Sequence, residues 1–220
     1  MNQKLKVKGI LFDLDGTIVD SKAAYLEAAR KAFAVLGRDP IEAPEALEIP
    51  KRLEQGLPIT DLVRANVHAF LDTYLKTYYS VTKSLTRPVI NARATLEVLS
   101  LKAKLALITM RFVPRSSVVD ELDQFGLAGF FAYIVTAMDT IEPKPSPKSL
   151  ISAVKALDVD ICDCVIVGDS VVDVRAGKSA GAMTVAVLSG LYTREELSME
   201  KPDLIVKDIT ELPIFLDFGP

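Results

Sequence analysis

The chain of 220 residues contains no tryptophan, one histidine and two cysteines. A single histidine argues against a zinc site, and Cys162 and Cys164 are too close together to suggest a disulfide framework, so we expect structural thiols beside a strand. No segment is long and apolar enough to span a membrane. The apolar run after the first lysines is interrupted by Asp13 too early for a signal peptide, and we therefore expect a cytoplasmic protein.

The chain also lacks an excess of positive charge. It has 26 lysines and arginines against 29 acidic residues, a formal net charge of -3. This balance provides no general electrostatic basis for nucleic-acid binding, although a local basic group can still hold a small phosphorylated molecule. Half of the residues are hydrophobic, so the chain can bury a substantial core as one domain or as one domain with a smaller insert.

From Asn91 onward, apolar helices alternate with apolar strands, and turn residues separate them. This alternation is typical of βαβ units and predicts a doubly wound α/β fold around a parallel, Rossmann-like sheet. The expected strands span residues 7–12, 105–109, 133–136, 164–167 and 183–187. The expected helices span residues 91–101, 114–125, 147–157 and 171–180.

The alternation is absent between Asp20 and Arg87, where the pattern indicates only helices. These helices are expected at residues 21–36, 45–55 and 60 to about 84, with prolines 40, 44, 50 and 58 punctuating the segment. Residues 20–87 are therefore predicted to form a helical cap domain inserted into a core of residues 1–19 and 88–220. An insert directly after an acidic strand end is suitably placed to act as a lid.

Two acids, Asp13 and Asp15, follow the first apolar strand of the core. Aspartate is rarely buried without a partner, and alternation along an extended chain turns both carboxylates to the same side. They are thus placed to share one metal ion or one substrate, while Gly16 and Thr17 permit a sharp turn and supply a hydroxyl group. The alternative is a turn or helix cap in which Asp15 or Thr17 binds backbone amides.

Three further strand ends carry polar groups: Thr109, Lys144 between two prolines, and Asp169 with Asp173 four residues later. Each has an ordinary structural explanation, namely a strand-terminal threonine, a rigid solvent-facing loop and a helix N-cap. Ligands of open α/β sheets bind at the carboxyl ends of the strands, so we expect these groups to converge on one crevice with Asp13. Oxygen ligands from Asp13, Asp169 and the backbone carbonyl of Asp15 suit Mg²⁺.

In this order the motifs resemble those of the haloacid dehalogenase superfamily of phosphohydrolases, over nearly the whole chain. The four matching segments are Asp13-Leu14-Asp15-Gly16-Thr17, Thr109, Lys144-Pro145-Ser146-Pro147, and Gly168-Asp169-Ser170 with Asp173. The helical insert resembles the C1 cap of that family. One departure is Met110, which stands where phosphoglycolate-phosphatase-like members commonly have asparagine.

The resemblance implies that Asp13 attacks the phosphorus of a monoester and that Asp15 serves as general acid and base. Thr109, Lys144 and the backbone at Met110 would contact the phosphoryl group, with Arg111 as a second anion contact.

Asp173 and Thr17 are expected to support the site without binding the metal directly. On this hypothesis the protein is a Mg²⁺-dependent phosphatase acting on a small phosphorylated metabolite, as a monomer or homodimer.

Several functions remain open from the sequence. Phosphoglycolate is the leading substrate by resemblance, followed by pyrophosphate or a small sugar phosphate. A phosphomutase of the β-phosphoglucomutase type uses the same aspartyl-phosphate, although Gly168 before Asp169 favours a phosphatase. The presence of Asp15 argues against a dehalogenase, and the intact pair of acids argues against a non-catalytic binding or regulatory protein. Cap residues would choose the leaving group, with candidates Lys51, Arg52, Arg64, His68, Lys76, Tyr78 and Tyr79.

Overall fold

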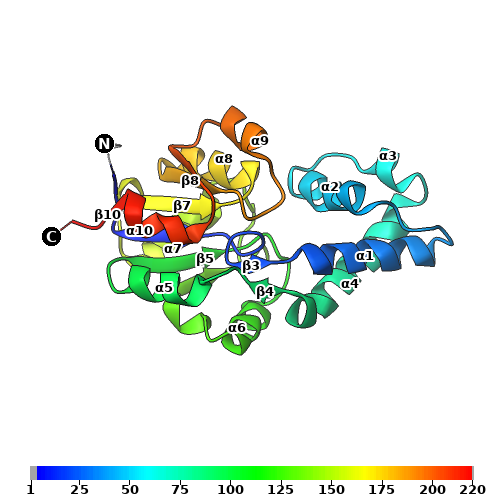
Figure 1. Cartoon of the computed structure of the whole chain (residues 1–220), viewed down its shortest axis with the longest axis horizontal. Coiled ribbons are helices and arrows are strands. Elements are labelled where there is room, and N and C mark those ends of the chain that lie inside the picture. Colours follow the sequence, from blue (N-terminus) through cyan, green and yellow to red (C-terminus); the bar gives the residue numbers. More distant parts are fainter. Residues whose placement is uncertain (1–3, 220) are drawn as a thin grey trace. The chain divides into compact units, whose positions relative to one another are not determined.

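The computed structural model describes residues 4–219, which divide into two compact units. Within the described chain, one unit combines residues 4–19 with residues 88–219, and the other is Asp20–Arg87 (Figure 1). In the described part of the chain, no helix is both long enough and apolar enough to cross a membrane.

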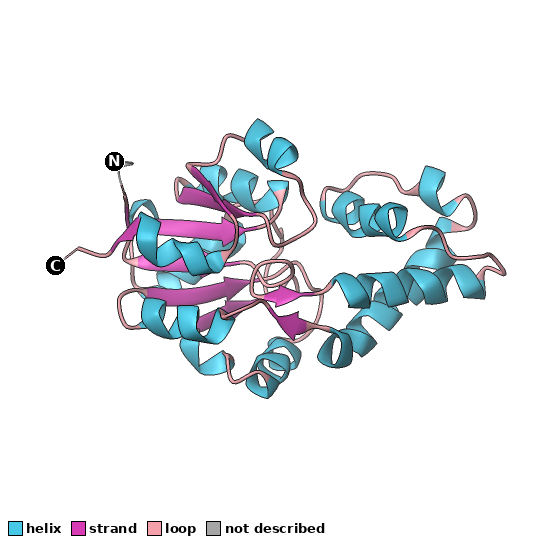
Figure 2. Cartoon of the chain, in the orientation of Figure 1, coloured by secondary structure: helices cyan, strands magenta, loops and turns pink. Residues whose placement is uncertain are grey.

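A parallel sheet forms the centre of the first unit (Figure 2). Within residues 4–219 it has six strands in the order β6-β5-β2-β7-β8-β9. The strands are β2 (Gly9–Phe12), β5 (Lys104–Ile108), β6 (Tyr133–Val135), β7 (Cys164–Gly168), β8 (Met183–Val187) and β9 (Leu204–Val206). Strand β2 lies between β5 and β7, with Phe12 opposite Leu107 on one side and Val167 on the other. The predicted doubly wound α/β fold is confirmed.

Helices cover both faces of this sheet, which explains why its strands are apolar along their whole length rather than alternating. Ile10 and Phe12 of β2 pack into the cluster that contains the core residues of α5 and α6, while Leu11 packs toward α7. The helices of this unit are α5 (Ala92–Ser100), α6 (Arg115–Gln124), α7 (Lys148–Leu157), α8 (Val171–Ala180), α9 (Arg194–Met199) and α10 (Leu212–Phe215).

Shorter elements complete the described chain. Strand β1 (Leu5–Lys6) pairs with β10 (Leu216–Asp217), and β3 (Val19–Asp20) pairs with β4 (Arg87–Pro88). Short 3₁₀ helices lie at Ala128–Phe130, Ile161–Asp163 and Ile209–Glu211. Strand β9 and helices α9 and α10, which are short or only partly buried, are not among the elements expected from the sequence.

The second unit is a helical bundle of α1 (Lys22–Val35), α2 (Ala43–Glu54), α3 (Thr60–Val63) and α4 (Val67–Leu85). Helix α1 packs along α4, and alanines spaced four residues apart on α1, such as Ala24 and Ala28, are fully buried. Phe33 of α1 and Phe70 of α4 meet edge to face with ring centroids 4.9 Å apart.

Two local predictions for this unit are wrong. The single helix expected from Thr60 to about Ser84 is broken, because Arg64 adopts a left-handed conformation (φ 49°) and ends α3. Asn66 then caps α4 by accepting a hydrogen bond from the Ala69 amide at 3.1 Å. Pro50 does not mark a turn but lies buried inside α2.

Candidate active site

The parallel register brings three predicted site residues to one edge of the sheet. Asp13, Thr109 and Asp169 each follow directly on neighbouring strands β2, β5 and β7, and all three are buried. The Asp13 amide donates a hydrogen bond to the Val167 carbonyl at 2.9 Å, and the Thr109 amide donates to the Val135 carbonyl at 2.9 Å. The backbone at these strand ends is therefore held by the sheet, so the side chains start from defined positions.

Lys144 lies in this same cluster and is 2% exposed. Its Nζ donates to Asp13 Oδ1 at 2.6 Å, to Asp173 Oδ1 at 2.6 Å and to the Ile108 carbonyl at 3.0 Å. Burial alone lowers the pKa of Lys144, but the two carboxylates outweigh burial and hold it above the ordinary value. The alternative of a solvent-facing loop lysine is thus excluded, and the ammonium group is a fixed positive charge.

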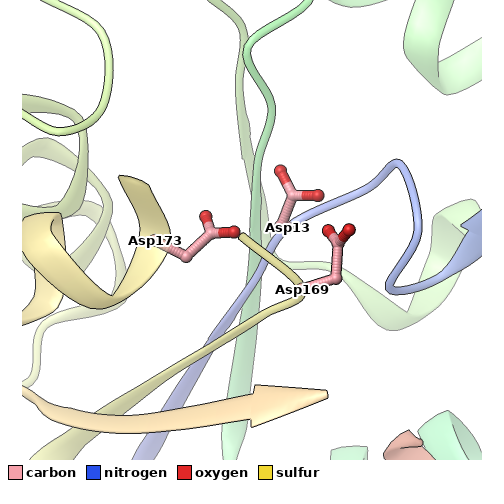
Figure 3. A group of neighbouring side chains, drawn as sticks. All are labelled: Asp13, Asp169 and Asp173. Carbon is pink, nitrogen blue, oxygen red and sulfur yellow. The ribbon is translucent and has the colours of Figure 1, made fainter. Parts of the chain in front are cut away.

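Asp13, Asp169 and Asp173 bring one carboxylate oxygen each to within 4.8 Å of the others (Figure 3). Burial raises the pKa of Asp13 to about 7, and the neighbouring carboxylates of Asp173 and Asp15 add to this effect while Lys144 opposes it. The cluster holds three carboxylates and one ammonium group, that of Lys144. A buried all-oxygen donor set of this kind fits a hard divalent cation such as Mg²⁺.

Both carboxylate oxygens of Asp173 have protein donors. Oδ1 accepts from Lys144, and Oδ2 accepts from the Ser170 amide at 3.2 Å as part of a capping box at the start of α8. These contacts suit the supporting role expected for Asp173, because they leave this residue holding Lys144 and the first turn of the helix.

A loop after β8, which was not predicted as part of the site, holds Asp169. Asp169 Oδ2 accepts a hydrogen bond from the Leu191 amide at 3.1 Å. A Cβ atom on Gly190 would lie 1.6 Å from that oxygen, and one on Gly16 would lie 2.5 Å from it, so both positions require the close backbone approach that glycine allows. Ser189 Oγ also donates to the Gly16 carbonyl at 2.6 Å. The available signal was Ser189-Gly190 directly beyond the strand predicted at 183–187.

Asp15 is paired with Arg111, for which the sequence predicts a contact with the anionic substrate. The Arg111 guanidinium is 4% exposed and donates to both oxygens of Asp15, at 2.7 and 2.8 Å. It also donates to both oxygens of Glu121 on α6, at 2.6 and 3.2 Å. The tertiary structure thus directs the arginine toward carboxylates. Glu121 was missed, although a glutamate beside Val118 and Leu122 on the apolar face of a helix was a signal.

The remaining predicted site residues also lie in the first unit. Thr17 is fully buried, and its Oγ1 has no hydrogen-bond partner within residues 4–219. Thr109 Oγ1 accepts from the Arg111 amide at 3.2 Å, and Met110 between them is partly buried.

The cap residues expected to choose the leaving group differ from one another in their contacts and exposure. Arg52 forms an ion pair with Asp61 at 2.6 Å, and Tyr78 stacks on Tyr25 with ring centroids 4.8 Å apart. Lys51 keeps only 11% of its side chain exposed, with its Nζ 3.3 Å from Glu48. The structure therefore gives Arg52 and Tyr78 packing or pairing roles within the helical unit.

Comparison with known proteins defines the class of this chain. Residues 10–187 match the family of haloacid dehalogenase-like hydrolases. The chain belongs to this family, and it is a phosphatase of the family's type.

Individual relatives align with this chain over most of their length. The phosphoglycolate phosphatase of Neisseria meningitidis is 30% identical, with 94% of this chain and 92% of that protein covered. Pyrophosphatase PpaX of Halalkalibacterium halodurans is 26% identical, with 94% and 96% covered. A haloacid dehalogenase-like hydrolase from Streptococcus pneumoniae has a similar structure, with a TM-score of 0.81 at 21% identity over 95% of this chain and 98% of that chain. A candidate β-phosphoglucomutase from Thermotoga maritima gives a TM-score of 0.73 at 25% identity, with 94% and 98% covered.

Proposed function

We propose that this phosphatase depends on Mg²⁺ and hydrolyses a small phosphate monoester through an aspartyl-phosphate on Asp13. The observation that carries the proposal is the cluster in which buried Asp13 faces Lys144 at 2.6 Å and shares a close group of carboxylates with Asp169 and Asp173. Such a cluster combines a nucleophile with the positive charge that an anionic substrate needs.

In the first step, an Asp13 carboxylate oxygen forms a bond to phosphorus while the bond from phosphorus to the leaving oxygen breaks. Asp15 supplies the proton that this oxygen takes up. In the second step, water attacks the phosphorus, Asp15 takes the proton, and the bond to Asp13 breaks. Phosphate is released and both aspartates return to their original states.

Positive charge is required because two anions must meet. Lys144 provides one such charge from a buried and fixed position. Bound Mg²⁺, held by Asp13, Asp169 and the Asp15 carbonyl, would supply the rest by neutralising charge on the phosphoryl oxygens. The Thr109 hydroxyl and the backbone amides near Leu14 and Met110 are the proposed donors to the remaining oxygens.

Phosphoglycolate is the leading substrate in this proposal. Support comes from the relatives, because the protein from N. meningitidis that aligns over nearly the whole chain is a phosphoglycolate phosphatase. Pyrophosphate ranks next because PpaX is also similar over nearly its whole length. The helical unit of residues 20–87 is proposed to choose among leaving groups, since the chemistry-bearing residues all belong to the other unit.

A phosphomutase is the second candidate, favoured by the similarity to the T. maritima structure. The residue before Asp169 supports the phosphatase instead, because Gly168 leaves no second acid at that position. A Cβ on Gly168 would lie 2.2 Å from the Asp173 carboxylate, so a larger residue does not fit here without displacing Asp173.

The test is a panel of phosphate esters assayed for phosphate release with Mg²⁺ and with EDTA. Phosphoglycolate, pyrophosphate and a hexose monophosphate separate the candidates, and phosphorus NMR distinguishes free phosphate from an isomerised sugar phosphate. We expect Asp13→Asn to abolish phosphate release, whereas Asp123→Asn, at an exposed site on α6, leaves it intact. Wild-type turnover by Asp13→Asn would rule out covalent catalysis by this residue.

A further inference from the structure

Arg111 is a buried arginine between two carboxylates at the end of β5. Its Nε donates to Asp15 Oδ2 at 2.8 Å and its Nη2 donates to Asp15 Oδ1 at 2.7 Å. This bidentate geometry restrains the position and the rotation of the Asp15 carboxylate, which a single donor would not do.

Glu121 holds the arginine in turn. Its side chain is 2% exposed on α6, and its oxygens accept from Arg111 Nη1 at 2.6 Å and Nη2 at 3.2 Å. Nε, Nη1 and Nη2 of Arg111 therefore all donate to carboxylates. Glu121, anchored on α6, thus holds a second edge of the guanidinium, adjacent to the edge that binds Asp15.

Stability alone does not explain this triad. A buried ion pair is often no more stabilising than packed hydrophobic residues of similar volume, because removing the charges from water is costly. Val118 and Leu122 on the same helix face are packed in the apolar core, where another leucine at position 121 would be the simpler solution. The charged triad is better explained by what it does to Asp15.

We propose that Arg111, supported by Glu121, is a positioning residue for Asp15 in the hydrolysis of the aspartyl-phosphate. The inference rests on the proposed function, in which Asp15 takes a proton from the attacking water. As the water oxygen bonds to phosphorus, its proton passes to the Asp15 carboxylate and the bond between phosphorus and Asp13 breaks. The electron pair of that bond returns to Asp13.

The geometry suits this half of the reaction. A carboxylate has about four acceptor sites on its two oxygens, so the two bonds from Arg111 leave acceptor capacity for a water molecule. Arg111 therefore orients Asp15 without saturating it.

The test uses p-nitrophenyl phosphate in rapid mixing, because p-nitrophenolate leaves without needing a proton. In Arg111→Met, formation of the aspartyl-phosphate should continue while its hydrolysis slows. We expect a burst of about one p-nitrophenolate per enzyme, followed by steady-state turnover about 10- to 100-fold slower than wild type. A merely structural role would reduce the burst and the turnover together.

Two further variants keep the test decisive. Arg111→Met leaves Glu121 buried without its arginine, so if this variant does not fold, the double variant Arg111→Met/Glu121→Met is used and should show the same burst. Arg30→Met is the matched control, since Arg30 makes a bidentate pair with Glu27 on the exposed surface of α1. It should behave like wild type.

The outcomes separate this inference from the proposed function. Loss of burst and turnover in parallel, unchanged kinetics, or faster turnover in the folded Arg111 variants would each overturn the positioning role. If Asp13→Asn kept its turnover, the proposed function itself would fail. Inactive Asp13→Asn together with an Arg111→Met enzyme that accumulates no aspartyl-phosphate would reject only the inference.

Discussion

The buried carboxylate of Asp13 is expected to lower the stability of the metal-free protein as the pH rises from acidic to neutral values. Burial raises the pKa of Asp13 from an ordinary 3.8 to about 7. The folded chain therefore binds more protons at this site than the unfolded chain between these values, and stability falls as pH rises through this window. At about 1.4 kcal/mol per pH unit, the free energy of unfolding is lowered by about 4 kcal/mol in total by pH 8.

Asp13→Asn removes this titration while keeping nearly the same side-chain shape. The variant should be more stable than wild type at pH 8, and the difference in unfolding free energy should widen by about 3 kcal/mol between pH 5 and pH 8. For a chain of this size the corresponding change in Tm is about 6–12 °C. Thermal unfolding in EDTA at pH 5, 6, 7 and 8 measures it, with Asp123→Asn as an exposed control.

The change in Tm on adding Mg²⁺ is a second, independent test in the same experiment. Added Mg²⁺ should raise the Tm of wild type at pH 8 more than that of Asp13→Asn, because a cation offsets the excess negative charge of the cluster. Parallel Tm profiles for wild type and Asp13→Asn across pH in EDTA would refute the reasoning, since they would show that the Asp13 carboxylate is not destabilised by burial.

Two other substitutions test the metal site and the choice of substrate. Gly190→Ala should weaken Mg²⁺ binding about 10- to 100-fold, measured by calorimetry, because the new Cβ would displace the Asp169 carboxylate; unchanged affinity would show that the loop after β8 does not position Asp169. Lys51→Met should alter the relative rates on different phosphate esters with no change in Mg²⁺ dependence. Lys76→Met is the control, because the Lys76 ammonium pairs with Asp72 on an exposed helix face, and it should leave these relative rates unchanged. Unaltered relative rates in Lys51→Met would exclude this lysine from substrate selection.

Much of the fold could be read from local pattern. The helix at Val171–Ala180 and the strand at Met183–Val187 have the bounds expected from sequence, because most buried positions of each are apolar and each is ended by glycine or turn residues. The helix expected from Thr60 failed for a local reason that periodicity cannot detect. Arg64 takes a left-handed conformation that nothing in its residue type demands.

The amino-acid sequence by itself determined which chemistry-bearing groups stand at strand ends. Asp13, Thr109 and Asp169 interrupt apolar runs, and an apolar run followed by a polar group marks the carboxyl end of a buried strand. Parallel pairing then required these three groups to share one edge of the sheet. The sequence did not determine whether Lys144 is buried, since its neighbouring prolines fit an exposed loop as well as a buried one.

Only the tertiary structure decided which charges meet. Arg111 and Asp15 are separated by 96 positions in the chain, and Lys144 and Asp13 by 131, so no local pattern relates them. The sequence puts Glu121 on the apolar face of a helix, but its pairing with Arg111 arises only when α6 packs into the core and buries both residues. The physical reason is that local pattern reports burial and backbone preference, whereas electrostatic pairing depends on distances that arise only when distant segments pack together.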